Sequence, residues 1–179
     1  LSSFQLMDME RSPQRALITN LAPNHLDIHK DMEEYVEAKK NIYRFQDETG
    51  ILVLNVDNAI TSQLRGNGET RYFSREKRTN CVWEEDGVIY RRGEKILESK
   101  DILIPGTHNI ENYMAAIALV EGLATDDAIR QVARAFGGVE HRIELVRVKD
   151  GVRFYNDSIA SSPSRTIAGL RSFPEQVIL

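Results

Sequence analysis

The chain has 179 residues, of which 41% are hydrophobic and 28% are charged, a composition typical of a folded globular protein. Its net charge of −4 and its lack of long Lys/Arg runs exclude a basic surface for nucleic acid. The sequence has no run of about 18 apolar residues to cross a membrane and no basic-then-apolar leader. Its single cysteine, Cys81, has no second thiol for a disulfide or a CxxC site, so we expect a cytoplasmic protein without membrane contact.

The first third of the chain predicts a βαβ unit. Apolar runs with β propensity at 15–20 and 51–56 indicate two strands, and the spacing of apolar residues over about 31–46 indicates a helix between them. Both strands are nearly continuous in hydrophobicity. They are therefore expected in a parallel sheet that is covered on both faces.

Shorter alternating segments follow at 71–74, 81–83 and 88–90, with turn signals at Asp86-Gly87 and Arg92-Gly93. These segments predict a small antiparallel excursion. Two helices are then expected over 109–121 and 126–136, and the Gly137-Gly138 pair after them is expected to act as a hinge.

Beyond the hinge, a hairpin is predicted from strands at 143–148 and 152–155, followed by a helix at 165–171 and a strand at 176–179. The fold class is therefore α/β: a mostly parallel sheet with flanking helices over 1–138, and the start of a second, Rossmann-like α/β domain over 139–179. Because the chain opens without Met and stops on an apolar run, we expect it to be a piece of a longer protein. Nothing in the sequence specifies an oligomeric state.

Lys39 occupies an unexpected position on the predicted 31–46 helix. At about 100° per residue, it lies at the centre of the apolar stripe made by Met32, Tyr35, Val36, Ile42 and Tyr43. A lysine there must extend its ammonium to water, pair with another group, or lose its charge. A neutral amine can serve chemistry, and it can add CO2 to become a carbamate, an oxygen ligand for a metal.

The segment NLAPNHLDIH at 20–29 follows the first strand directly, at the carboxyl end where open α/β sheets bind ligands. His25, Asp27 and His29 have the spacing of a loop ligand set, and the βαβ unit brings His25 near Lys39. The same residue types, with Asn24, also serve as turn and cap formers. Both interpretations stay open from the residues alone.

Seven motifs, in this order, resemble the Mur ligase family across essentially the whole chain. They are LSSFQL from Leu1, TNLAPNHLDIH from Thr19, YVEAKKNIY from Tyr35, LNVDN from Leu54, GTHNIENYMAA from Gly106, EHRIE from Glu140 and YNDSIASSP from Tyr155. The LSSFQL opening is most similar to the branch that adds D-glutamate to UDP-N-acetylmuramoyl-L-alanine in peptidoglycan synthesis.

The resemblance implies an ATP-dependent carbon–nitrogen ligase. Such an enzyme phosphorylates the carboxylate of UDP-N-acetylmuramoyl-L-alanine and lets the amine of D-glutamate displace the phosphate, with Mg2+ neutralising phosphoryl charge. ATP and Mg2+ are therefore the implied cofactors, and the two substrates are the implied partners.

The resemblance also implies roles for individual residues. His25 and Lys39, as its carbamate, match the catalytic ligands of the second Mg2+, and Ser2 and Gln5 match residues that contact the UDP-muramoyl substrate. Asn109 and Asn112 match the pair near adenine and ribose; taken alone, Asn109 is equally a helix cap.

On the carboxyl side of the hinge, Arg142 matches a phosphate-contacting arginine, whereas taken alone it is a surface arginine that begins a strand. Asp157 and Ser158 match the nucleotide-side and D-glutamate-side residues at a strand end. The alternative for this pair is an Asx turn.

The sequence departs from the family pattern at two points. Ile159 stands where many members have a lysine in the NDSKAT version of the motif, with Arg165 as a speculative substitute, and no GxxxxGK[ST] phosphate loop occurs in these residues. We therefore expect these 179 residues alone to be inactive. The alternatives are another Mur ligase, a folylpolyglutamate synthase-like ligase, or a noncatalytic nucleotide- or metal-binding module.

Overall fold

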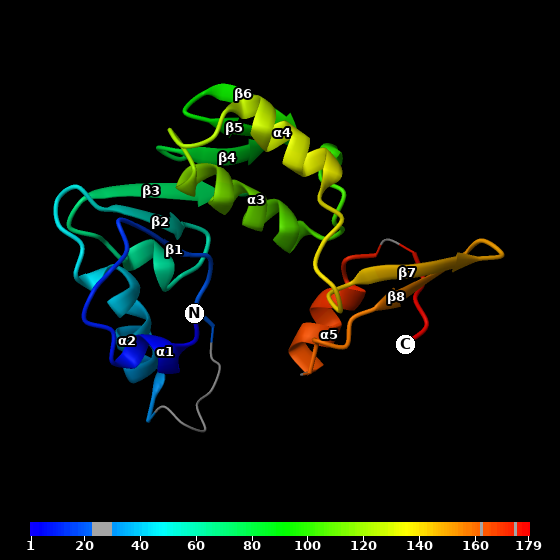
Figure 1. The fold of residues 1–179 in the computed structure, drawn as a ribbon, viewed down its shortest axis with the longest axis horizontal. Coiled ribbons are helices and arrows are strands. Elements are labelled where there is room, and N and C mark those ends of the chain that lie inside the picture. Colours follow the sequence, from blue (N-terminus) through cyan, green and yellow to red (C-terminus); the bar gives the residue numbers. More distant parts are fainter. Residues whose placement is uncertain (23–29, 162, 174) are drawn as a thin grey trace.

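Six strands form one sheet in sequence order, and two later strands form a separate hairpin (Figure 1). This computed structural model describes residues 1–22, 30–161, 163–173 and 175–179. The strands are β1 (Arg15–Ile18), β2 (Ile51–Asn55), β3 (Glu69–Ser74), β4 (Val82–Glu85), β5 (Val88–Arg91), β6 (Glu94–Glu98), β7 (Glu144–Lys149) and β8 (Val152–Asn156). The α-helices are α1 (Ser3–Met7), α2 (Met32–Arg44), α3 (Thr107–Leu119), α4 (Asp126–Ala135) and α5 (Pro163–Leu170).

Strands β1 to β4 run parallel to one another, and β4, β5 and β6 are antiparallel. The mostly parallel α/β class predicted from the sequence is therefore confirmed. The assignment of 71–74 to an antiparallel excursion was wrong, because β3 pairs in parallel with β2 from Ile51↔Glu69 to Asn55↔Phe73. Arg71 is buried in this strand, where the carboxylates of Glu69 and Glu121 pair with its guanidinium.

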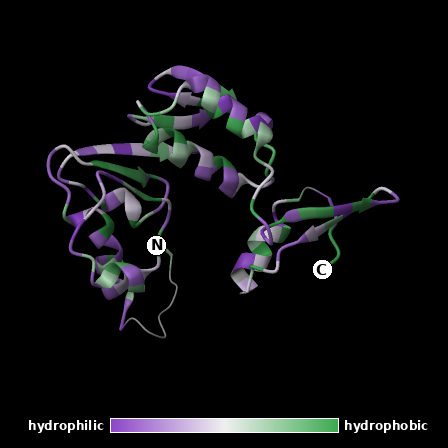
Figure 2. Cartoon of the chain, in the orientation of Figure 1, coloured by the Kyte–Doolittle hydropathy of each residue, from purple (hydrophilic) through white to green (hydrophobic). Residues whose placement is uncertain are grey.

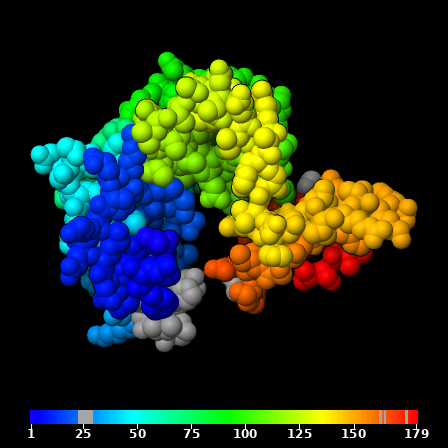
Figure 3. Space-filling model, in the orientation of Figure 1, coloured from blue at the N-terminus to red at the C-terminus, as the bar shows by residue number. Residues whose placement is uncertain are grey.

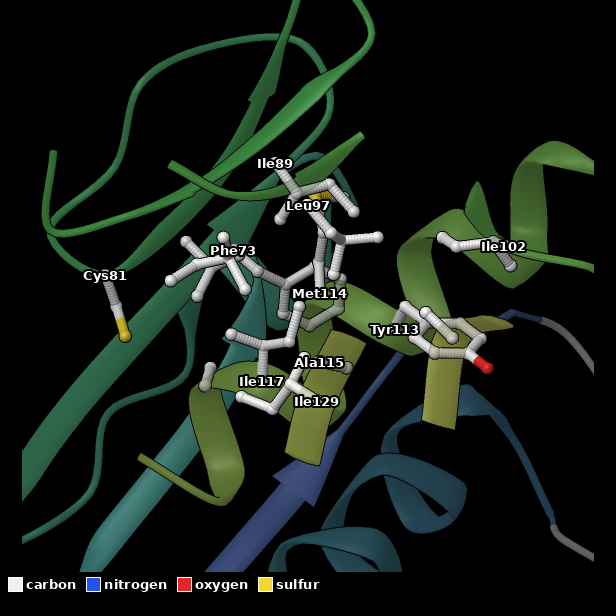
Figure 4. Packing of buried hydrophobic residues seen from close by; sticks show 14 of the residues in the cluster. Phe73, Cys81, Ile89, Leu97, Ile102, Tyr113, Met114, Ala115, Ile117 and Ile129 are labelled. Atoms are coloured by element: carbon white, nitrogen blue, oxygen red, sulfur yellow. The ribbon is translucent and has the colours of Figure 1, made fainter. Parts of the chain in front are cut away.

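The six-stranded sheet is covered on both faces, as its continuous hydrophobicity predicts. Along β2, Val53 packs in a cluster with α3 and α4, whereas Leu52 and Leu54 pack in a second cluster with α2. Successive strand residues point to opposite faces, so one strand supplies both cores. Figure 4 shows the first cluster, in which Phe73 from β3 lies near Met114 from α3. Each such fully buried side chain contributes about 2 kcal/mol.

Helix α2 presents the predicted apolar stripe to the second cluster. Tyr35 and Tyr43 are buried there, and the other apolar residues of the stripe pack against it. The Asp31 side chain caps the helix by accepting a hydrogen bond from the Glu34 backbone N–H at 2.9 Å. Helix α1, which sequence reasoning did not predict, packs against α2.

The residues after α4 are less buried than those of the six-stranded sheet. The β7–β8 hairpin leaves several apolar side chains exposed, and Figure 2 shows strongly hydrophobic stretches along it. The strand predicted at 176–179 is not formed, because these residues have no hydrogen-bonded strand partner in the described part of the chain. Among the helices of the described ranges, none has both the length and the hydropathy needed to span a bilayer.

Candidate functional site

A cavity of about 360 Å3 lies where α3, the end of α4 and the following linker meet. It is lined by Asn109, Asn112 and Arg142 together with His108, and by apolar walls that include Ile104, Tyr113, Val132, Phe136 and Val139. The structure thus brings together three of the residues that the sequence singled out, two from the start of α3 and one from the linker after α4. We call this space the junction cavity.

Gly106 fixes where α3 begins and how closely it approaches the end of α5. Its φ is 100°, and a Cβ at this position would lie 2.6 Å from the Ser172 hydroxyl and 2.7 Å from the His108 ring. Only glycine combines that backbone conformation with that contact. The first turn of α3, which carries His108 and Asn109, is therefore set against the junction cavity.

The two asparagines are linked to each other. Asn112 donates a hydrogen bond to the Asn109 side-chain oxygen at 3.3 Å, and Asn109 donates to the Pro105 carbonyl at 2.6 Å. Asn109 is not the helix cap that its position suggested, because Gly106 occupies the N-cap. Asn112 is exposed at the cavity wall, and this hydrogen bond uses only one donor of its side-chain amide. Its second N–H and its amide oxygen can still bond to a ligand.

Arg142 supplies a positive charge at the wall of the junction cavity. Burial first, and then the positive charge of Arg142, lower the pKa of His108, while the Asp157 carboxylate opposes the shift. In the described part of the chain, no carboxylate lies within ion-pair distance of the Arg142 guanidinium. A cavity with an apolar wall, two amides and an unneutralised guanidinium is suited to a planar base that carries an anionic group.

Asp157 and Ser158 lie apart from the two asparagines. They line a second cavity, of about 840 Å3, between β8, α5 and residues 175–179. Asp157 accepts a hydrogen bond from the Ile143 backbone N–H at 3.1 Å, and the Asx turn here belongs to Asn156, whose side chain accepts from the Ser158 N–H at 3.1 Å. Ile159, which replaces the family lysine, is 53% exposed.

Lys39, Ser2 and Gln5 form a separate group at the start of the chain. The Lys39 ammonium is 2.8 Å from the Leu1 backbone oxygen and 5.7 Å from the centre of the Tyr35 ring, and burial lowers its pKa. Ser2 and Gln5 bond to each other as the capping box of α1. Figure 3 shows a hollow between this side of the molecule, in blue, and the side of the linker and α5, in yellow and orange.

The predicted metal site is described only in part, on its lysine side. His25, together with Asn24, Asp27 and His29, lies outside the described residues. Within the ranges that are described, no group of three His, Cys, Asp or Glu side chains is arranged to hold a metal. Lys39 itself fits the carbamate chemistry, since it is a half-buried amine with a lowered pKa.

Sequence reasoning missed His108 and the apolar walls of the junction cavity. His108 directly precedes Asn109 in the GTHNIEN motif, and its place in the first helical turn was the available signal. The walls carried no signal, because Ile104, Phe136 and Val139 look like ordinary core residues in one dimension.

Comparison with known proteins places this geometry in a family. The Mur ligase middle domain matches residues 2–120. The UDP-N-acetylmuramoylalanine–D-glutamate ligases of Acetivibrio thermocellus and of Clostridium botulinum (strain Alaska E43 / Type E3) are 55% and 48% identical to the chain over its whole length. The chain spans 40% of the length of each of these relatives.

Solved structures show the same fold. MurC of Thermotoga maritima has a TM-score of 0.69 at 25% identity, covering 96% of this chain and 40% of that one. MurF of Acinetobacter baumannii has a TM-score of 0.70 at 18% identity, covering 93% and 38%. With two thirds of its residues matched by the middle-domain family, this chain belongs to the Mur ligases.

Proposed function

We propose that the chain is the ATP-binding central part, with the beginning of the third domain, of a ligase that adds D-glutamate to UDP-N-acetylmuramoyl-L-alanine. The observation that carries this proposal is the junction cavity, where Asn109, Asn112 and Arg142 meet. The substrate assignment rests on the names of relatives that are 45–55% identical to the chain.

The nucleotide is assigned to the junction cavity. The amides of Asn109 and Asn112 orient adenine and ribose, the apolar wall excludes water from the base, and Arg142 holds a phosphate group. Asp157 supports the nucleotide from the end of β8. MurF of Thermotoga maritima, which has this fold at a TM-score of 0.67, was solved in complex with ADP.

The acceptor carboxylate is assigned to the N-terminal side of the hollow. Ser2 and Gln5 contact the UDP-muramoyl substrate, and Ser158 contacts D-glutamate. Lys39, as its carbamate, and His25 hold the second Mg2+, which when bound neutralises charge on the phosphoryl group. The γ-phosphoryl group is transferred to the carboxylate, and the amine of D-glutamate then displaces phosphate to form the amide.

This assignment divides the chain into residues 1–138, which belong to the central domain, and residues 139–179, which begin the carboxy-terminal domain. Reaction requires the two sides of the hollow to approach each other, and the linker after α4 is the segment assigned to that closure. The reaction is assigned to the cytoplasm, in line with the buried free thiol of Cys81.

The test uses a protein of the relatives' full length that contains this chain, because the 179 residues carry no phosphate loop. We expect ADP formation only when UDP-N-acetylmuramoyl-L-alanine and D-glutamate are both present. Equal turnover with L-lysine, diaminopimelate or a folate in place of D-glutamate would overturn the substrate assignment and favour a sister ligase. Nucleotide binding without any turnover would favour a noncatalytic module.

A further inference from the structure

The backbone on both sides of Arg142 adopts an unusual conformation. His141 has φ of 65° and Ile143 has φ of 47°, and the segment begins with Gly138 at φ of 108°. Left-handed backbone is uncommon for residues other than glycine, and for a β-branched residue such as isoleucine it is a marked outlier. Such a conformation persists only where surrounding contacts hold it.

The end of β8 and the residues after it supply several of these contacts. The Ile143 N–H donates to the Asp157 carboxylate at 3.1 Å, and the His141 carbonyl accepts from the Ile159 N–H at 3.2 Å. On its other side, the His141 N–H donates to the Glu144 carboxylate at 2.8 Å. Both neighbours of Arg142 are therefore held through their backbone groups.

Asn156 makes the shorter of two side-chain contacts to the His141 ring, and the Glu144 carboxylate lies 3.9 Å from the same ring nitrogen. Its amide nitrogen lies 2.9 Å from the His141 Nδ1, and its amide oxygen accepts from the Ser158 N–H at 3.1 Å. Since the oxygen is already used, the amide nitrogen faces the ring, and an amide nitrogen can only donate. In this contact the Asn156 amide is the donor, and Nδ1 accepts in the tautomer that carries its proton on Nε2.

We propose that Asn156 and His141 are positioning residues for Arg142. By fixing the His141 ring to the end of β8, Asn156 keeps the left-handed backbone at His141 and directs the next residue toward the junction cavity. This inference rests on the proposed function, in which Arg142 holds a phosphate group. His141 and Asn156 would then affect the affinity of the protein for the nucleotide without contacting the nucleotide themselves.

The competing explanation is that the His141–Asn156 contact only stabilises the hairpin. The two explanations differ in their dependence on Arg142. A positioning pair has nothing to position once the guanidinium is removed, whereas a contact that only stabilises the hairpin acts equally with and without it.

The experiment is a double-mutant cycle in the full-length ligase that contains this chain. The affinity for the β,γ-imido analogue of ATP, with Mg2+, is measured by calorimetry for the parent protein, His141→Ala, Arg142→Ala and the double variant. We expect His141→Ala to weaken binding about three- to tenfold, the usual effect of one lost hydrogen bond. In the Arg142→Ala background, the same change should alter binding by less than about twofold.

Two further variants sharpen the cycle. His141→Asn places a side-chain oxygen near the position of Nδ1 and suits a left-handed backbone, so it should restore the parent affinity. Arg153→Gln removes an exposed ion pair with Glu175 on the same hairpin and should leave affinity unchanged. If His141→Ala does not fold, Asn156→Leu makes the same test from the other side of the contact.

The outcomes separate the inference from the function beneath it. Equal losses from His141→Ala in both backgrounds, or no loss at all, would overturn the positioning role while leaving that of Arg142 intact. An Arg142→Ala protein with parent affinity would instead remove the phosphate role of Arg142, and the inference with it.

Discussion

The ammonium of Lys39 donates a hydrogen bond to the Leu1 backbone oxygen at 2.8 Å, the point where α2 reaches the start of the chain. In the described residues no carboxylate pairs with this ammonium. Burial lowers its pKa, so the amine gives up its proton more readily than a solvated lysine. Carbamate formation needs a neutral amine, so a lowered pKa favours it. Lys40, the next residue on α2, provides a matched control.

Lys39→Ala in the full-length ligase should lower kcat/KM by at least about 100-fold, because the proposed Mg2+ ligand is lost. Short carboxylates such as acetate should restore part of the rate by replacing the carbamate oxygens. Lys40→Ala, which removes only an ion pair with Glu37, should stay near the parent rate. A Lys39→Ala enzyme with nearly normal turnover would show that the side chain is only an amphipathic stem.

The His108 imidazole should report the charges around the junction cavity. Because Arg142 lowers its pKa and Asp157 raises it, Arg142→Ala should raise the pKa and Asp157→Asn should lower it. NMR titration of the ring protons measures both changes. Shifts in the same direction for the two variants would mean that these charges do not face the ring as the structure has them.

Stability should depend on His108 in one pH window. Its pKa in the folded protein is lowered, mainly by burial, so the unfolded chain binds a proton first as the pH falls. Stability should therefore decrease as the pH drops below the ordinary value of about 6.5 and stay constant above it. The free energy of unfolding of His108→Asn, measured in urea, should depend less on pH in this window than that of the parent protein. Above the window, the two free energies should have the same pH dependence, although their values differ.

Glu121 is the centre of a half-buried ion network at the end of the sheet opposite the carboxyl ends of β2 and β3. Its carboxylate pairs with Arg71 at 3.1 Å and with Arg92 at 2.7 Å. Burial raises the pKa of Glu121, but the hydrogen bond from Arg92 and the nearby arginine charges outweigh it and lower the pKa overall.

Glu121→Ala should destabilise the fold by about 2–3 kcal/mol, because the buried Arg71 loses a partner. Arg78→Ala, which breaks an exposed pair with Glu85, should cost less than about 1 kcal/mol. Urea unfolding followed by the fluorescence of Trp83 measures both. Equal costs for the two variants would contradict a buried role for the network.

Cys81 should be inert in the folded protein. It has no exposed surface, and burial, followed by the charge of Glu121, raises the pKa of its thiol to about 12. A disulfide reagent at pH 8 should label it only after unfolding in urea, since the thiolate is the reactive form. Rapid labelling without denaturant would show that this part of the core opens.

The sequence predicted an element correctly where its hydrophobic residues followed one clear pattern, either a helical stripe or a continuous apolar run. The stripe of α2 and the continuous apolar runs of β1 and β2 translated directly into buried faces. The pattern misled at β3, where the buried Arg71 pairs with Glu69 two residues before it and with the distant Glu121. Helix α1 was missed because its five residues are too few for a periodic signal.

By itself, the sequence determined the α/β class and the two covered faces of the sheet. Those properties depend on local periodicity and on side-chain type. Only the tertiary structure decided that Asn109, Asn112 and Arg142 share a cavity, while Asp157 lines another and Lys39 lies with Leu1. The positive-φ backbone of the linker and the close contact at Gly106 set the positions of these elements relative to one another. Such long-range packing produces no periodic pattern of hydrophobic residues in the sequence.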